Sequence, residues 1–442
     1  MIDRTPEQWR DKLLKELEER RELHGLLRGY YIGNQPLPTA PSTATDTYRR
    51  LAELGVTNMC GLVVDSVNER LRPRGVRLTA DSTADLDIWR RVWQANNLDS
   101  DWSLAQEEAL KIGRCPILVW PNGDGTVSVT VEDADEVIIA YAAGSRRQRV
   151  AMLKSYEDDE VKFATVWTPT DVHSWYFAKQ TSRWFDDAQL SGSNPLGRVP
   201  GVELLCKPSV KGVPAPELST AVIRLQDRIN KTMFDAVVSS EFGSFPLRYT
   251  IGIEIRRDPI TGVPVNPLTI GPNRVLALEA SEGQSGTIGQ LEPFPLADLL
   301  SLADASIKHL ASISQTPVYY LLSGLTNVGA DSIRAAETGH VAKILKHQGM
   351  FGEAAGDVFQ LALIAMGDPT PPTDIALEWA PPETRSPAEL ADAVIKMSQA
   401  GYPFLAIARY MGESPSDVER LVRERAAQDI AERDDVAALT SA

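Results

Sequence analysis

The feature that most constrains this chain is a long helical pattern that runs from about Ala330 to Met366 and is interrupted by glycines. At about 1.5 Å per residue, such a helix would be about 55 Å long. Gly349, Gly352 and Gly356 each cost roughly 1 kcal/mol relative to alanine, so each marks a close backbone approach or a bend. The apolar positions at helical spacing are Ile333, Val341, Ile344, Phe351, Val358 and Phe359.

An apolar loop, residues 314–330, comes directly before this helix, and two amphipathic helices come before the loop. The helix Leu296–Ile313 is separated from the helix Ser219–Ser240 by a β-rich stretch, Phe245–Phe294, which is broken by Pro and Gly. This order seldom suits a catalytic pocket, and it favours a subunit that spans the wall of a ring and places the loop in the lumen. The expected buried stripes are Val222, Leu225, Ile229, Met233 and Val237 on the earlier helix, and Leu299, Leu300, Ala303, Ile307 and Leu310 on the later one.

The N-terminal part of the chain is predicted to be helical. Thr5 is suited to cap a helix, with Pro6 in the first turn and Gln8 in the capping-box position, and the pattern runs to about Leu27 and ends near Gly29. Further helices are predicted over Asn58–Leu71, Leu86–Asn96 and Trp102–Ile112, with Trp89, Val92, Trp93 and Leu98 as core residues.

From Pro116 onward the hydrophobic period changes from helical to two. Asn122-Gly-Asp-Gly is a hairpin signal between the first two predicted strands. The predicted strands are Ile117–Trp120, Thr126–Glu132, Val137–Tyr141, Arg149–Tyr156, Val161–Trp167 and His173–Ala178. Because no helices alternate with these strands, the pattern predicts an antiparallel meander and an α+β fold rather than a parallel α/β fold. The best linker candidate is Pro208–Pro216, and a last helical unit, Pro387–Ala438, is broken near Gly401 and Gly412.

The chain of 442 residues is acidic, with a formal charge of −15 and an isoelectric point of about 5.0. A protein that grips duplex DNA over its whole surface needs a basic footprint, so this charge excludes that class. Acidity could keep the protein soluble, or it could help DNA pass without sticking. No window approaches ~18 uninterrupted apolar residues, and the first residues are charged, so we expect a protein that is cytosolic or assembled from the cytosol, without a membrane partner.

Residues that carry chemistry are sparse. The three cysteines, Cys60, Cys115 and Cys206, lie in apolar runs and are expected to be buried thiols rather than metal ligands or disulfides. None of the five histidines forms a His-x-x-x-His pair or lies near a cysteine in the sequence. His340 and His347 are seven residues apart on one helix face, at about 10 Å. We therefore expect no catalytic residue, no cofactor and no metal.

Other motifs fail on their context. The sequence contains no phosphate-binding Gly-x-x-x-x-Gly-Lys-Ser/Thr motif and no Gly-x-Ser-x-Gly elbow, and the glycines between Gly283 and Gly289 lack a strand–loop–helix unit. Two carboxylate clusters occur, at 132–136 and 157–160, and the second is centred on a predicted hairpin tip. A solvated turn is the favoured interpretation there, with a cation site as the alternative.

The order of several short motifs resembles a known family. Tyr30-Tyr-Ile-Gly-Asn, then Thr57-Asn-Met-Cys-Gly-Leu-Val-Val-Asp-Ser-Val-Asn-Glu-Arg-Leu, then Gly75-Val, resembles the N-terminal signature of portal proteins of long-tailed double-stranded DNA phages, especially those of actinobacterial hosts. Ile223-Arg-Leu-Gln-Asp-Arg-Ile-Asn, Ser314-Gln-Thr-Pro and Lys346-His-Gln-Gly-Met-Phe-Gly are also similar to that family. The resemblance covers nearly the whole chain, without an additional enzymatic domain.

The resemblance implies a division of the chain into the parts of a portal subunit. It implies a wing over residues 1–214, stem helices over 215–243 and 296–315, a clip over 244–295, a tunnel loop over 316–330, a long tunnel and wing helix with its return over 331–385, and a small helical crown over 386–442.

The resemblance also implies a ring, usually of twelve copies, at one vertex of the capsid. The ring would form the channel for genome packaging, retention and ejection, without sequence specificity toward the double-stranded DNA. The implied partners are terminase, the head–tail adaptor, and major capsid and scaffold proteins, with assembly in the host cytoplasm. The residues expected in these roles are Leu321, Leu322, Ser323, Gly324, Leu325, Thr326, Asn327 and Val328 in the tunnel loop, Lys308, Arg334, Lys343 and Lys346 as lumen or intersubunit charges, and Arg256, Arg257, Asp258 and Thr261 as clip contacts.

Two alternatives remain open at this point. One is a different phage head–tail connector ring, although such chains are generally shorter and lack paired stem helices around a β insert. The other is a nucleic-acid or nucleotide enzyme of unread fold, against which the missing motifs count.

Overall fold

The computed structural model describes residues 4–38, 46–78, 82–244, 248–251, 260–261, 287–290, 295–322, 330–368, 371, 375–383, 387–411, 417–418 and 420–428. The chain divides into two compact units. Unit 1 comprises residues 1–35, 58–226 and 308–442, and unit 2 comprises residues 36–57 and 227–307. Each unit is described by itself below.

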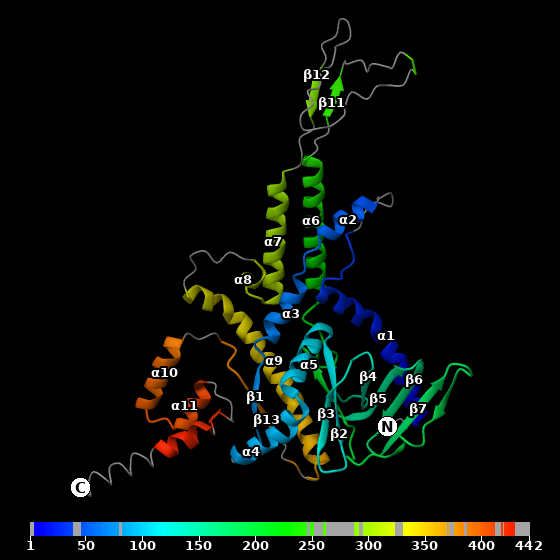
Figure 1. The fold of residues 1–442 in the computed structure, drawn as a ribbon, viewed down its shortest axis with the longest axis vertical. Coiled ribbons are helices and arrows are strands. Elements are labelled where there is room, and N and C mark those ends of the chain that lie inside the picture. Colours follow the sequence, from blue (N-terminus) through cyan, green and yellow to red (C-terminus); the bar gives the residue numbers. More distant parts are fainter. Residues whose placement is uncertain are drawn as a thin grey trace, which may run out of the picture. The chain divides into compact units, whose positions relative to one another are not determined.

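Figure 1 shows the helices and strands of the described residues and labels most of them. The helices are α1 (Pro6–Ile32), α2 (Asp46–Leu54), α3 (Cys60–Asn68), α4 (Ser82–Ile88), α5 (Leu98–Ile112), α6 (Thr220–Ser244), α7 (Leu296–Ser314), α8 (Val318–Leu321), α9 (Ala330–Ala365), α10 (Pro387–Gln399) and α11 (Phe404–Met411). The strands are β1 (Pro73–Arg77), β2 (Arg114–Pro121), β3 (Val127–Val131), β4 (Val137–Tyr141), β5 (Arg149–Asp158), β6 (Val161–Trp167), β7 (Asp171–Ala178), β8 (Arg183–Asp186), β9 (Gly192–Ser193), β10 (Gly201–Leu205), β11 (Arg248–Ile251), β12 (Thr287–Gln290) and β13 (Ala376–Trp379).

The capping box predicted for the first helix is confirmed. The Thr5 hydroxyl accepts from the Gln8 backbone N–H, and the Gln8 side chain accepts from the Thr5 backbone N–H. The predicted end near Gly29 is wrong, because α1 continues to Ile32 and ends where Gly33 adopts a left-handed conformation with φ of 84°. Glycine reaches that region without the steric cost of a Cβ, so the stop signal is the second of the two glycines.

The last four strands of the predicted meander, over residues 137–178, lie in the larger sheet of unit 1, whereas its first two strands, over residues 117–132, lie in a separate sheet. Strands β4 to β8 pair in sequence order, all antiparallel, with β9 paired to β7. One face packs on Trp9, Leu13 and Leu17 of α1, and the other carries Met152 and Trp167. A second antiparallel sheet has the order β10-β2-β3, and its outer strand β10 was not predicted.

The aromatic residues predicted as core are buried between the short helices and α9. Trp89 and Trp93 stack at 4.4 Å between ring centroids, and each lies 6.2 Å from the ring of Phe359 on α9. The segment Trp89–Trp93 is a π-helical turn, and the left-handed Asn97 separates it from α5. The prediction of one continuous helix over Leu86–Asn96 is therefore wrong, although its buried side chains were predicted correctly.

The long helix α9 confirms the predicted span and packs against β2, β10 and β13. Its three glycines differ in their surroundings. A Cβ at Gly356 would lie 3.0 Å from the carbonyl oxygen of Ile375, and a Cβ at Gly352 would lie 3.4 Å from the indole nitrogen of Trp379. Gly349 has no atom within 4 Å of such a Cβ. Close approach to the backbone therefore explains Gly356. A Cβ at Gly352 would make an ordinary van der Waals contact, and Gly349 is a position at which alanine would fit.

Unit 2 contains α2, most of α6 and the first part of α7. Helix α2 was not predicted. Gly55, directly after its last residue, packs closely against α6, since a Cβ at this position would lie 2.8 Å from backbone atoms of Phe234. The predicted buried stripe of α6 is confirmed at Val222, Leu225 and Ile229, whereas Met233 and Val237 are half-buried. Leu300 was predicted to be buried on α7 and is instead 49% exposed. Among the described residues of the predicted β insert, β11 and β12 form an antiparallel pair.

Together, the helices and antiparallel sheets confirm the predicted α+β fold class. The C-terminal helical unit begins with α10 and α11 as predicted, with a break at Gly401, which adopts a left-handed conformation with φ of 78°.

Candidate functional site at the start of the loop before α9

The candidate functional site lies where α7 ends and the chain turns toward α9. Helix α7 ends at Ser314, and the next residue, Gln315, adopts a left-handed conformation with φ of 52° although it carries a Cβ. The backbone N–H of Thr316 then donates to the carbonyl of Ala311 at 3.0 Å, which closes a Schellman-type turn. Pro317 directly precedes α8, a single helical turn, and the following loop residues 323–329 lie outside the described part.

Helix α8 is held by a polar network around Arg70. The Arg70 guanidinium donates to Glu337 of α9 at 2.8 Å and to the Tyr320 hydroxyl at 2.9 Å. Tyr320 donates to Glu69 at 2.5 Å, and Tyr319 donates to Glu337. Burial raises the pKa of both tyrosines, and their carboxylate partners raise it further, so both hydroxyls stay protonated as donors. The two ends of the loop, α8 and the first turns of α9, are therefore tied to the end of α3.

Two side chains of α9 bind the carbonyls at the end of α7. The Lys343 ammonium donates to the carbonyl of Ser314 at 2.7 Å. One turn earlier, His340 lies with Nδ1 2.9 Å from the carbonyl of Gln315. The last carbonyls of a helix have no partner within the helix and carry its negative dipole end, so donors and cations stabilise that end.

A buried charge cluster lies beneath this turn, around Glu217. The Glu217 carboxylate is 2.6 Å from the Lys207 ammonium, 2.7 Å from Nε2 of His347 and 3.4 Å from the Lys343 ammonium. Burial raises the pKa of Glu217, but the hydrogen bond from His347 and the two ammonium groups lower it more, so that it stays far below its usual range. Burial lowers the pKa of His347.

Cys206, Glu217 and His347 bring three potential metal ligands within 4.8 Å of one another, all buried. Burial raises the pKa of the Cys206 thiol, so the thiolate that a soft metal requires is disfavoured. Two ammonium groups already neutralise Glu217, and a cation would have to displace them. The arrangement therefore fits a structural ion cluster and does not fit a metal centre.

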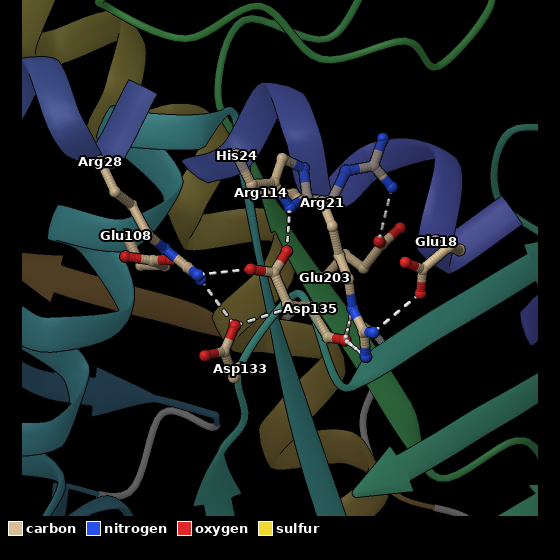
Figure 2. A network of polar contacts seen from close by, with 9 residues as sticks. All are labelled: Glu18, Arg21, His24, Arg28, Glu108, Arg114, Asp133, Asp135 and Glu203. Carbon is tan, nitrogen blue, oxygen red and sulfur yellow. Dashed lines mark hydrogen bonds and ion pairs between the residues drawn. The ribbon is translucent and has the colours of Figure 1, made fainter. Parts of the chain in front are cut away.

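The first carboxylate cluster of the sequence, residues 132–136, is not a solvated turn. As Figure 2 shows, Asp133 and Asp135 lie under α1, where Arg28 contacts Asp133 at 2.6 Å and Asp135 at 2.5 Å. His24 lies 2.5 Å from Asp135 through Nδ1. Burial raises the pKa of Asp135, but the hydrogen bonds from His24 and Arg28 lower it more. These carboxylates join α1 to the sheet. In the second cluster, the hairpin tip over residues 157–160 is exposed, as predicted.

A cavity of 530 Å³ lies between the β4–β5 hairpin and α9. Its lining includes three arginines and three carboxylates, several of which pair with one another. Arg149 is 3.2 Å from Asp357, and Arg147 is 3.8 Å from Glu353. Because its charges balance, this cavity does not indicate a particular ligand.

The predicted site residues lie in different environments. Leu321 is buried and Leu322 is half-buried, whereas Ser323, Gly324, Leu325, Thr326, Asn327 and Val328 lie outside the described residues. Lys308, Lys346 and Thr261 are exposed. Arg256, Arg257, Asp258 and the side chain of Arg334 also lie outside the described part. Lys343 is 6% exposed and faces Glu217, so its charge is used within the subunit and we no longer count it among the lumen or intersubunit charges.

Comparison with known proteins identifies the family. Residues 10–409 match the family described as phage portal protein, SPP1 Gp6-like. The chain belongs to this portal family. It is 27% identical over 436 residues to the portal protein of Mycobacterium phage D29, and the aligned region covers 94% of this chain and 87% of the relative. It is 28% identical over 354 residues to the portal protein of Mycobacterium phage L5, which covers 76% and 71% of the two chains.

The portal family is a structural family of the phage virion, which favours this interpretation over the two alternatives left open by the sequence. Among solved structures, a chain in the neck of an empty gene transfer agent particle matches with a TM-score of 0.44 and 12% identity, over 85% of this chain and 96% of that chain. At that TM-score the likeness does not place individual residues. Among the described helices of this portal protein, none is both long enough and apolar enough to span a membrane.

Sequence reasoning missed the two polar networks of this portal protein. Glu217 lies just after the proline-rich break, and Arg70 lies just after α3, at positions where charges are usually solvated. The one signal available was the placement of Lys343 and His347 on the same helix face as the apolar Ile344 and Phe351. Charged side chains on an apolar face require buried partners.

Proposed function

We propose that this portal protein is the subunit of a ring of about twelve copies at one capsid vertex, which forms the channel through which double-stranded DNA is packaged, retained and ejected. The match to the portal family over residues 10–409 carries this proposal. The loop before α9 supports it, because its sequence is almost uncharged and both of its ends are held by the network around Arg70.

The parts of the subunit are proposed as follows. Residues 1–214 form the wing, α6 and α7 are the two stem helices, residues 244–295 form the clip and residues 316–330 form the tunnel loop. Helix α9 with its return to β13, residues 331–385, carries the loop, and residues 386–442 form a small helical crown.

The chemistry of the proposed loop suits passage of DNA. Phosphate-binding surfaces use Lys and Arg, which bind in a salt-dependent manner and hold the duplex in place. Residues 321–329 contain none of these side chains, so they would restrain DNA by shape rather than by charge. The net charge of −15 adds a general repulsion that is weak at physiological ionic strength.

The proposed partners act at other parts of the subunit. Terminase and then the head–tail adaptor would contact the clip, through Arg256, Arg257, Asp258 and Thr261. Lys308, Lys346 and Arg334 are the remaining candidates for lumen or intersubunit charges. Lys308 and Lys346 are exposed, and the side chain of Arg334 lies outside the described part. Major capsid and scaffold proteins would surround the ring, which would assemble in the host cytoplasm before it enters the virion.

Two measurements test this proposal. Native mass spectrometry and negative-stain microscopy of the purified protein should give a ring of about twelve subunits with a central hole. In the assembled phage, Leu322→Asp, Leu325→Asp and Val328→Asp should impair DNA packaging or retention. Leu190→Asp, at an exposed position of unit 1, is the matched control and should leave both unchanged. Normal packaging and retention in all three loop variants would exclude the loop assignment.

A further inference from the structure

The two ring nitrogens of His340 both face carbonyl oxygens. Nδ1 lies 2.9 Å from the oxygen of Gln315, and Nε2 lies 3.0 Å from the oxygen of Ser66. The side chain is 1% exposed, so water does not replace either contact. A carbonyl oxygen only accepts hydrogen bonds, so each contact needs a proton on the ring nitrogen.

The protonation state of His340 therefore decides how many of these hydrogen bonds form. A neutral imidazole carries one N–H, so one ring nitrogen would point its lone pair at a carbonyl oxygen. An imidazolium carries two and can donate to both carbonyls. The full arrangement of Ser66, His340 and Gln315 thus matches the protonated ring.

Both carbonyls lie at the C-terminal ends of helices, where the last carbonyl groups have no hydrogen-bond donor within the helix. The Ser66 carbonyl lies in the last turn of α3, and the Arg70 N–H that would normally reach it donates to Val67 instead, at 3.2 Å. Gln315 is the left-handed residue directly after α7. Because Ser66 lies within the helix and at its negative end, its oxygen is the stronger acceptor of the two.

Charged groups on the elements around the His340 ring shift the pKa of its imidazole. On α9, Glu337 favours the imidazolium and Lys343 opposes it. Arg70, which follows α3, also opposes the imidazolium. The centroid of the Tyr320 ring of α8 lies 6.0 Å from the centroid of the His340 ring. Burial lowers the pKa of His340, and the two cations lower it further, against the opposing effect of the two carbonyls.

We propose that His340 is a proton-operated clamp that joins α3 to the turn between α7 and α8. When neutral, the ring donates to Ser66 alone and leaves the Gln315 carbonyl without this donor. When protonated, it donates to both and holds the turn against α3. This inference concerns the folded chain itself and does not depend on the proposed ring or channel.

Hydrogen exchange measured by mass spectrometry on the full-length protein tests the clamp. Between pH 7.5 and pH 5.0, exchange corrected for intrinsic rates should slow about fivefold in peptides covering residues 312–322, and should change little in peptides covering residues 60–71. His340→Gln should abolish this pH-dependent step, and His309→Gln, at an exposed position of α7, should retain it.

The protonation of each histidine provides a second and independent readout. The exchange rate of the imidazole C2 proton is followed by mass spectrometry in the protein without substitutions. Its pH dependence gives the pH at which each of the five histidines is half protonated, which is the midpoint of its titration. The midpoint of His340 should coincide with the step in residues 312–322. Exchange in this turn that is independent of pH, a step that survives in His340→Gln, or two midpoints that differ would each overturn the proposal.

Discussion

The carboxylate of Glu217 and the imidazole of His347 form a hydrogen bond of 2.7 Å between residues that are 130 positions apart, and each of the two side chains is 1% exposed. This contact joins the segment that leads into α6 to the middle of α9. With Lys207 and Lys343 it forms one cluster of one anion and two ammonium groups, at the position where α7 ends.

The first prediction concerns this cluster. Glu217→Gln should lower the free energy of unfolding by about 3–5 kcal/mol, because it leaves the buried Lys343 ammonium and the half-buried Lys207 ammonium without their counter-charge. Urea denaturation followed by tryptophan fluorescence measures the change.

Glu353→Gln is the matched control on α9. Its carboxylate is exposed and lies 3.8 Å from the exposed Arg147, so its loss should change the free energy of unfolding by less than about 0.5 kcal/mol. Equal effects of the two substitutions would show that the Glu217 cluster contributes no more than a surface ion pair.

The second prediction concerns acid. Burial lowers the pKa of His347 below its usual value, so the unfolded chain takes up a proton at this residue before the folded chain does. The contribution of neutral His347 to the free energy of unfolding is therefore fully present above about pH 6.5. It decreases as the pH falls toward the pKa of His347 in the folded protein, by no more than about 1.4 kcal/mol per pH unit. Glu217, whose pKa is also lowered, adds a further loss below about pH 4.5.

Urea denaturation at pH 7.5, 6.5 and 5.5 measures this loss. His347→Gln keeps a donor for Glu217 but cannot titrate, so its stability should fall less over this range than that of the original protein. His309→Gln, on the exposed face of α7, should show the original pH dependence. An unchanged slope in His347→Gln would contradict the assignment.

The third prediction separates two glycines of α9. Gly349→Ala should stabilise the protein by about 1 kcal/mol, because alanine has the higher helix propensity and its Cβ would meet no atom within 4 Å. Gly356→Ala should destabilise it by about 1–3 kcal/mol, because its Cβ would lie 3.0 Å from the Ile375 carbonyl and push β13 away. Thermal unfolding of both variants is the measurement, and shifts of the same sign would refute the close approach.

The fourth prediction concerns the network at α8. Tyr320→Phe removes the hydroxyl that donates to Glu69 and accepts from Arg70, and should lower the free energy of unfolding by about 1–3 kcal/mol. Hydrogen exchange should become faster in peptides that cover residues 317–322. Tyr402→Phe, at a residue that is 55% exposed, should have an effect below about 0.5 kcal/mol and no effect on those peptides.

The fifth prediction concerns the strained end of α7. Gln315 is exposed and adopts the left-handed conformation that glycine adopts without steric cost. Gln315→Gly should therefore stabilise the protein by about 0.5–1 kcal/mol, while the backbone contacts of this turn persist. Gln180→Gly, at another exposed glutamine, is the control, and a loss of stability specific to Gln315→Gly would contradict the helix-end assignment.

Local patterns in the sequence predicted much of the fold. The capping residues at Thr5, the strands Val137–Tyr141 and Val161–Trp167, and the span of α9 depend on neighbouring residues, and all of them are confirmed. Helix α2 and strands β1, β10 and β13 were missed, because short segments form where distant partners bury them rather than where propensity is high. The order of motifs along the chain also pointed to the portal family, which the family match confirms.

The sequence by itself determined the helical and strand periods, the α+β class and the membership of a family, since these depend on composition, spacing and order. The tertiary structure alone decided which charges are buried. Lys343 resembles a surface lysine in the sequence, yet its ammonium binds Ser314 and Glu217 inside unit 1. His340 resembles an isolated histidine, yet α3 and the end of α7 bring a carbonyl to each ring nitrogen. Lys343 and Glu217 are 126 positions apart and His340 and Ser66 are 274 positions apart, and no local period encodes such contacts.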